Sequence, residues 1–142
     1  MTTPDEIDRL FVKTLTGDYD DDAPWDAVRR LQVIGSPEVF ERAAKYYASN
    51  EEIKRARGID VLAQLGVAAG KPHTAPVPTR DLVLARLVDE TSIRVIASSL
   101  YALGHLKNLE NFDIIIGFSD HEDSSVRDAW TYLEKVEGLS VF

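Results

Sequence analysis

The sequence of 142 residues contains no cysteine, only one methionine and no long apolar run. Without cysteine the chain has no disulfide, no thiolate metal ligand and no thiol nucleophile, which fits a reducing compartment. No apolar stretch approaches the roughly 20 residues that a membrane-spanning helix needs. The opening residues, MTTPDEIDRL, lack the basic and then apolar order of a signal peptide. The sequence therefore predicts a cytoplasmic protein with no membrane partner.

Positive charge is also scarce, because 16 Lys and Arg residues stand against 24 Asp and Glu residues, for a net charge of -8. Proteins bind nucleic acid largely through Lys and Arg that replace counterions on the phosphates. The composition therefore argues against a nucleic-acid partner. A basic cluster, Lys54, Arg55 and Arg57, falls where a helix is expected, and its spacing spreads the charges around the axis. We interpret this cluster as a solvated helix surface.

The sequence does contain apolar residues at helical spacing along most of its length. Between Val39 and Tyr47 they recur at i, i+1, i+4, i+5 and i+8, and Ser36 followed by Pro37 marks the start of that helix. No segment shows sustained alternation of apolar and polar residues, so we expect no sheet. Comparable patterns predict helices over residues 4–15, 24–34, 36–50, 51–65, 92–104, 108–119 and 124–138, and another that begins at Thr79 or Asp81 and ends at Val88. Residues 67–78, rich in Pro and Gly, are expected to form a loop, either a partner contact or a tolerated insertion.

Glycine closes the first helix of each predicted pair. Gly35, Gly66, Gly104 and Gly138 stand at intervals of 31, 38 and 34 residues. The residue after a helix often adopts the left-handed conformation, which glycine reaches without strain. Regular spacing of this size indicates an array of helical hairpins.

The segments SIRVIASSLYALGHLKN (92–108), RGIDVLAQLG (57–66) and DSSVRDAW (123–130) resemble HEAT-repeat proteins, in particular the bacterial group with HEAT-like repeats of the phycobilin-lyase type. The resemblance covers residues 22 to 138 and implies an all-α right-handed superhelix, an α-solenoid of about three and a half HEAT-like hairpins. We expect one domain over 1–142. Its parts would be an N-terminal capping helix and acidic linker (1–22), hairpins at 23–50, 51–90 and 91–121, and a partial C-terminal repeat (122–142).

The partial repeat leaves a question about the last helix. The sequence stops at GLSVF, where the fourth hairpin should have its second helix, so the apolar side of the last helix, with Trp130 and Leu133, would lack a covering layer. Three alternatives remain open: LSVF folds back as a lid, the helix mediates self-association, or the array continues in a longer chain.

The resemblance also implies that the second helix of each hairpin lines a concave docking face. The outward residues expected there carry both charge signs, which suits a protein or peptide partner of complementary charge. We therefore predict a non-catalytic protein interaction scaffold or adaptor that holds no cofactor and no metal. The candidate binding residues are Glu41, Arg42, Lys45, Arg80, Arg86, Glu110 and Asp113.

The alternative functions are an enzyme accessory or a metal-linked or tetrapyrrole-linked protein of the lyase type, and a small acidic immunity or inhibitor protein. The three histidines, His73, His105 and His121, are scattered. Deoxyhypusine hydroxylase, a HEAT-repeat enzyme, holds two irons with several His-Glu pairs, and this chain has the single pair His121-Glu122. One pair does not supply a two-iron site.

The acidic run DYDDDA places Asp18, Asp20 and Asp22 at alternate positions, as at the start of a calcium loop. An EF-hand then needs glycine and a bidentate glutamate where this chain has Ala23 and Arg29. We interpret the run as a solvated linker that caps the next helix.

Overall fold

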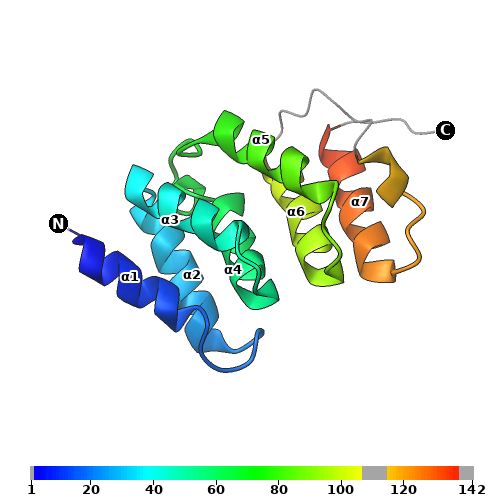
Figure 1. The fold of residues 1–142 in the computed structure, drawn as a ribbon. Helices are drawn as coiled ribbons and strands as arrows, with labels where there is room; N and C mark the ends of the chain where they lie inside the picture. Colours follow the sequence, from blue (N-terminus) through cyan, green and yellow to red (C-terminus); the bar gives the residue numbers. More distant parts are fainter. Residues whose placement is uncertain (1, 107–114, 138–142) are drawn as a thin grey trace. The chain divides into compact units, whose positions relative to one another are not determined.

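The computed structural model describes residues 2–106 and 115–137, and it is all-α over these residues, with no strand (Figure 1). The described helices include no segment long and apolar enough to cross a membrane. Two compact units, Met1–Ala75 and Pro76–Phe142, are described separately below. The helices are α1 (Pro4–Lys13), α2 (Asp22–Ile34), α3 (Pro37–Tyr47), α4 (Glu52–Ala63), α5 (Pro76–Leu87), α6 (Ile93–Leu106) and α7 (Ser124–Glu137), with 3₁₀ turns at Val67–Ala69 and Ile116–Phe118.

Two helices of the first unit, α1 and α3, begin at capping residues, and α2 ends at a glycine. The Thr3 hydroxyl accepts a hydrogen bond from the Glu6 amide before α1, and the Ser36 hydroxyl accepts one from the Val39 amide before α3. Such caps satisfy amides that have no partner inside the helix. Gly35 ends α2 in the left-handed region, with φ 56°, as the sequence predicts.

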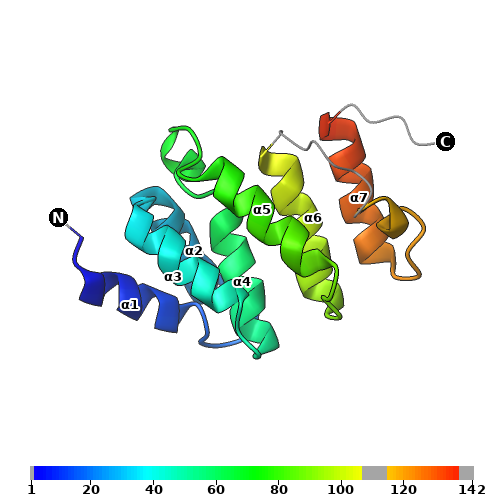
Figure 2. The same ribbon diagram turned by 45° about the horizontal axis from the view of Figure 1, so that its top comes forward.

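The core of the first unit lies where α2 contacts α1 and α4, and where α3 contacts α4 (Figures 1 and 2). Gly58 marks the closest approach of α3 and α4, because a Cβ at this position would lie 2.5 Å from the Tyr47 backbone nitrogen. The largest fully buried side chains of this unit are Phe11, Leu31, Tyr47, Arg57, Ile59, Leu62 and Leu65. Each large apolar side chain among them contributes roughly 1.5–3 kcal/mol on burial.

In the second unit α6 packs against α5 and α7. The prediction that Gly104 closes a helix is wrong, because α6 continues to Leu106. A Cβ at Gly104 would instead lie 2.6 Å from the Tyr132 ring of α7, so this glycine makes room for an aromatic side chain. The expectation of an uncovered last helix is also wrong, since Trp130 is 4% exposed and Leu133 is fully buried. The lid alternative concerns residues 139–142, which lie outside the described residues, and self-association through α7 stays a prediction.

The loop expected over residues 67–78 is shorter than predicted, because α5 begins at Pro76. The connection from α4 is held to the first unit by hydrogen bonds. The Thr74 amide donates to the Leu65 carbonyl (2.9 Å) and the Thr74 hydroxyl donates to the Gly35 carbonyl (2.6 Å). Two other boundaries differ: α2 starts two residues before Pro24, and most of the helix predicted over 108–119 lies outside the described residues.

The order of buried, half-buried and exposed positions repeats along the chain. Residues 37–47 of α3 and residues 77–87 of α5 have the same order at every position, 40 residues apart. The positions that are at most 1% exposed in the two helices are Val39, Ala43 and Tyr47 in α3, and Thr79, Val83 and Leu87 in α5. The buried positions Ser92, Val95, Ile96 and Ser99 recur 34 residues later as Val126, Ala129, Trp130 and Leu133.

Candidate functional site

Three of the predicted binding residues, Glu41, Arg42 and Lys45, share the face of α3 that points away from α4. Glu41 and Lys45 are exposed and form no ion pair with the part of the chain that the structure describes. Arg42 is half-buried and forms an ion pair of 2.6 Å with Asp8 of α1. This pair occupies the guanidinium of Arg42 within the unit, so the side chains of α3 that remain available to a partner are those of Glu41 and Lys45.

The remaining predicted residues do not join this face. Arg80 and Arg86 lie on α5 in the second unit, and both are half-buried. They hold the positions of Phe40 and Tyr46 in the repeated burial order, and Arg80 contacts Asp81 at 3.3 Å. The α5 positions equivalent to Glu41 and Lys45 are therefore Asp81 and Ala85. Glu110 and Asp113 lie outside the described residues.

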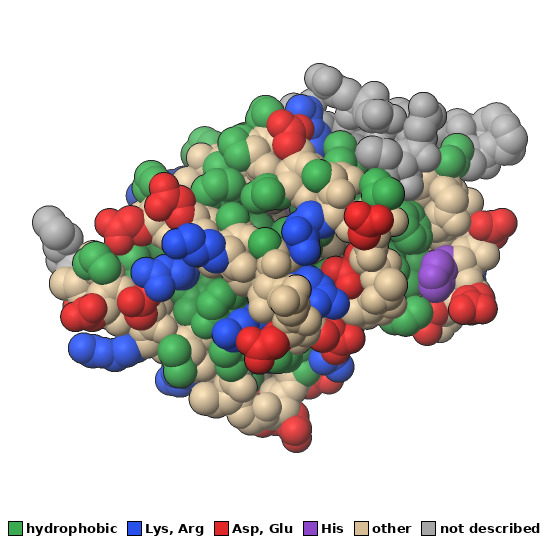
Figure 3. Space-filling model, in the orientation of Figure 1, with side chains coloured by type: hydrophobic (Ala, Val, Ile, Leu, Met, Phe, Trp, Pro, Cys, Tyr) green, Lys and Arg blue, Asp and Glu red, His purple; other side chains and the backbone are tan. Residues whose placement is uncertain are grey.

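On one face of the molecule, charged side chains of both signs lie side by side. On the face seen in Figure 3, Lys and Arg side chains alternate with Asp and Glu side chains and form no continuous patch of one sign. Such a surface favours a partner whose charges match locally over a partner that carries one uniform charge.

The outer face of α3 is held in place by aromatic contacts next to it. The Tyr46 ring lies edge-on to Phe11 of α1, with centroids 4.9 Å apart, and Lys54 Nζ lies 5.7 Å from the Tyr46 centroid. Burial raises the pKa of the Tyr46 phenol, against the lowering effect of the Lys54 and Arg42 cations. The phenol therefore stays neutral near pH 7. The Tyr46 contacts with Phe11 and Lys54 pack α3 next to the face that carries Glu41 and Lys45.

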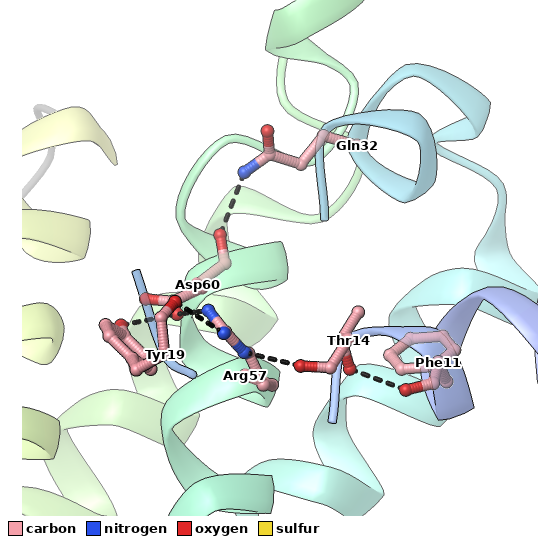
Figure 4. A network of polar contacts seen from close by, with 6 residues as sticks. All are labelled: Phe11, Thr14, Tyr19, Gln32, Arg57 and Asp60. Atoms are coloured by element: carbon pink, nitrogen blue, oxygen red, sulfur yellow. Dashed lines mark hydrogen bonds and ion pairs between the residues drawn. The ribbon is translucent and has the colours of Figure 1, made fainter. Parts of the chain in front are cut away.

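Arg57 is not the solvated residue that the sequence analysis predicts, because it is 1% exposed. Its Nε donates to the Thr14 carbonyl (2.7 Å) and its Nη2 to the Tyr19 carbonyl (2.7 Å), while Nη1 lies 3.5 Å from Asp60 Oδ2 (Figure 4). The guanidinium carbon also lies 4.1 Å from the Tyr19 ring centroid and 5.1 Å from that of Trp25. We call Thr14, Tyr19, Trp25, Arg57 and Asp60 the Arg57 cluster.

The Arg57 cluster ties the acidic linker to α4. The Tyr19 hydroxyl donates to Asp60 Oδ2 (2.6 Å), and the Gln32 amide donates to the Asp60 carbonyl (2.8 Å) (Figure 4). Linker carboxylates point elsewhere, since Asp18, Asp20 and Asp22 are exposed and Asp21 accepts from the Asp18 amide (2.8 Å). The contacts of Arg57 all lie inside the first unit, so its role is structural.

A groove of about 680 Å³ lies between α1 and α2. Its apolar side chains are Leu10, Val33 and Ile34, and Val33 is 51% exposed. Polar residues of α1 and α2 surround these side chains. The lining residues are Thr2, Glu6, Arg9, Leu10, Lys13, Arg30, Val33 and Ile34. We call this feature the α1/α2 groove.

The described residues contain no group of three or more His, Asp and Glu side chains placed to hold a metal ion. His121 Nδ1 accepts from the Asp123 amide (3.0 Å), and His105 Nδ1 lies 3.0 Å from the Tyr132 hydroxyl. These contacts place His105 and His121 in local packing and turn structure.

His73 secures the connection between α4 and α5. Its Nδ1 accepts from the Ala75 amide (3.0 Å), so the neutral ring carries its proton on Nε2 and donates to the Leu62 carbonyl (2.6 Å). Burial lowers the pKa of the His73 imidazole, against the raising effect of the Leu62 carbonyl. Near pH 7 the ring is therefore neutral and acts as a bridge between two backbone groups.

Comparisons with known proteins add no assignment. The chain matches no family model, and neither the curated proteins nor the solved structures contain a match. The candidate site therefore rests on the geometry of the chain itself.

Proposed function

We propose that the chain is a short array of HEAT-like helical hairpins that acts as a non-catalytic protein interaction module. The observation that carries the proposal is the identical burial order of α3 and α5, 40 residues apart. In a helical array each hairpin buries one side against its neighbours and leaves the same side of each equivalent helix outward. The spacing of Gly35 and Gly66, and the 34-residue recurrence in α6 and α7, support the same interpretation.

The binding residues in this proposal are the outward side chains of α3 and α5. On α3 these are Glu41 and Lys45, with Arg42 held by Asp8 beside them. On α5 the equivalent positions belong to Asp81 and Ala85. Because α3 approaches α4 to backbone contact at Gly58, its outward residues keep fixed spacing, which lowers the ordering cost when a partner binds.

Affinity capture with matched lysine variants tests the proposal. The full chain and its Lys45→Glu and Lys71→Glu variants are immobilised and exposed, at low and moderate salt, to lysate of the organism that naturally makes the protein. Both lysines are exposed, and both substitutions change the net charge equally, but Lys71 lies outside α3 and α5. We expect one stoichiometric protein on the wild-type chain and on Lys71→Glu, with several-fold less on Lys45→Glu and at the higher salt.

A photo-crosslinking amino acid at position 41 or 45 then locates the contact, with position 71 as the control. We expect the captured protein to be crosslinked at positions 41 and 45 only. An empty capture, or equal retention by Lys45→Glu and the wild-type chain, contradicts the proposed face.

A further inference from the structure

The α1/α2 groove concentrates positive charge in an acidic chain. Arg9 and Lys13 stand four residues apart on one face of α1, and Arg30 lines the groove from α2. All three side chains belong to exposed residues, and none forms an ion pair with the described part of the chain. The neighbouring Arg29, in contrast, pairs with Asp26 at 2.5 Å, with both side chains exposed.

The groove also has an apolar part that a soluble helix pair would normally cover. Leu10 is 9% exposed and forms the inner wall, while Val33 is 51% exposed. A volume of about 680 Å³ lies within the range of about 300–1,000 Å³ typical of ligand sites. Cations around an apolar wall favour a ligand that combines carboxylates with apolar side chains.

We propose that the α1/α2 groove binds a short acidic amphipathic segment of another protein. Carboxylates of the segment pair with Arg9, Lys13 and Arg30, and its apolar side chains cover Leu10, Val33 and Ile34. In helix-in-groove recognition the anchors at i, i+3, i+4 and i+7 belong to the bound segment, so we expect its apolar side chains at that spacing. The proposal goes beyond the proposed function, because it assigns a second surface and the chemistry of its partner.

Two other occupants fit the groove less well. A nucleic acid would leave the apolar wall unused and would meet the carboxylate of Glu6 and a net charge of -8. A second copy of this chain could offer the acidic linker, but Tyr19 of that linker and Trp25 at the start of α2 already contact Arg57 of their own chain. The acidic run therefore lacks free apolar anchors.

The groove is distinct from the α3 face. Asp8, which pairs with Arg42 of α3, is two residues from Glu6 and so lies about 200° around the α1 axis from it. Variants of groove cations therefore leave the Asp8–Arg42 pair in place. The two proposals can therefore fail separately. The proposed function fails if Lys45→Glu captures as much protein as the wild-type chain, and this inference fails if Arg30→Glu binds the selected peptides as tightly as the wild-type chain.

The test selects peptides from a phage-displayed library of short random sequences on the immobilised full chain. Selected peptides are then titrated by fluorescence anisotropy against the wild-type chain and three variants: Arg30→Glu, the adjacent control Arg29→Glu, and Glu6→Gln. Circular dichroism confirms that each variant keeps its helix content. The control carries the same charge change on the same helix, one residue away.

We expect peptides with Asp or Glu next to Leu, Ile or Phe, and a loss of about tenfold or more in affinity for Arg30→Glu, which corresponds to roughly 1.4 kcal/mol. Arg29→Glu should change affinity less than about threefold, and Glu6→Gln should bind more tightly because a repulsive carboxylate is gone. Three results of the peptide test would overturn the proposal: no selected peptide binds, the selected peptides lack acidic residues, or Arg29→Glu and Arg30→Glu lose equal affinity. The wild-type chain and Arg30→Glu are also tested for binding to single-stranded DNA and for self-association. If the wild-type chain shows either activity and Arg30→Glu loses it, the groove has a different occupant and the proposal is overturned.

Discussion

The α3–α4 and α6–α7 interfaces both bring two helices together at a glycine, but different atoms face that glycine. At Gly58 a Cβ would lie 2.5 Å from the Tyr47 nitrogen and 2.7 Å from the Ala43 carbonyl oxygen, so backbone meets backbone. At Gly104 the nearest atoms belong to the Tyr132 ring. A side chain can turn away from a new methyl group, whereas the backbone of a packed helix has no such freedom.

The two interfaces also differ in the polar groups next to the glycine. In the first unit the residue before Gly58 is the fully buried Arg57, which binds two carbonyls of the linker. In the second unit a polar contact next to the glycine joins the Tyr132 hydroxyl and His105 Nδ1, two side chains. At the α3–α4 interface the partner atoms belong largely to the backbone, which cannot move aside as a side chain can. We therefore expect substitutions there to lower the free energy of unfolding more than substitutions at the α6–α7 interface do.

The largest effect is expected from Arg57→Ala. The change leaves the Thr14 and Tyr19 carbonyls and the Asp60 carboxylate without their cation, and removal of one partner of a buried charged group costs about 3–5 kcal/mol. Urea unfolding followed by Trp25 fluorescence in a Trp130→Phe background measures the stability of the first unit. Lys54→Ala, a half-buried position on the same helix whose side chain pairs with the exposed Glu51, serves as the control and should change stability by less than about 1 kcal/mol.

The glycine comparison is tested directly by Gly58→Ala and Gly104→Ala. Alanine favours a helix over glycine by about 1 kcal/mol at both positions. At Gly58 overpacking against backbone should outweigh this gain, for a net loss of about 2 kcal/mol. At Gly104 rotation of the Tyr132 ring should keep the net change within about 1 kcal/mol. Urea unfolding of both variants measures the change in the free energy of unfolding. Equal decreases for Gly58→Ala and Gly104→Ala would show that the atoms facing the glycine do not determine the size of the effect.

Most helix starts were predictable from sequence, and most tertiary roles were not. The capping residue Ser36 and the left-handed Gly35 act on neighbours in the chain, so local sequence is enough to predict them. Arg57 finds its partners at Thr14 and Tyr19, about 40 residues away, and a basic residue on a helix gives no local sign of such contacts. The role of Gly104 could not be predicted from local sequence either, because the Tyr132 ring that packs against it belongs to α7.

The candidate site divides in the same way. Helical spacing placed Glu41 and Lys45 on an outward face, but the ion pair that occupies Arg42 comes from Asp8 on another helix. The α1/α2 groove was missed, although one signal for it was present: Arg9 and Lys13 share a face of the first helix in an acidic chain. Helical spacing predicts that Arg9 and Lys13 share one face of α1. That Arg30 lies beside them depends on how α1 packs on α2, which the sequence does not show.

The smallest effect is expected from the titration of His73. Burial lowers the pKa of this imidazole in the folded chain below its usual value, so the folded state favours the neutral ring. The resulting stability is present above the unfolded pKa of about 6.5 and is lost as the pH falls through the lower, folded pKa. Protonation of Nδ1 would also place a donor opposite the Ala75 amide. Urea unfolding at a series of pH values should show this loss for the wild-type chain and a smaller one for His73→Gln; identical pH profiles would assign the dependence to other groups.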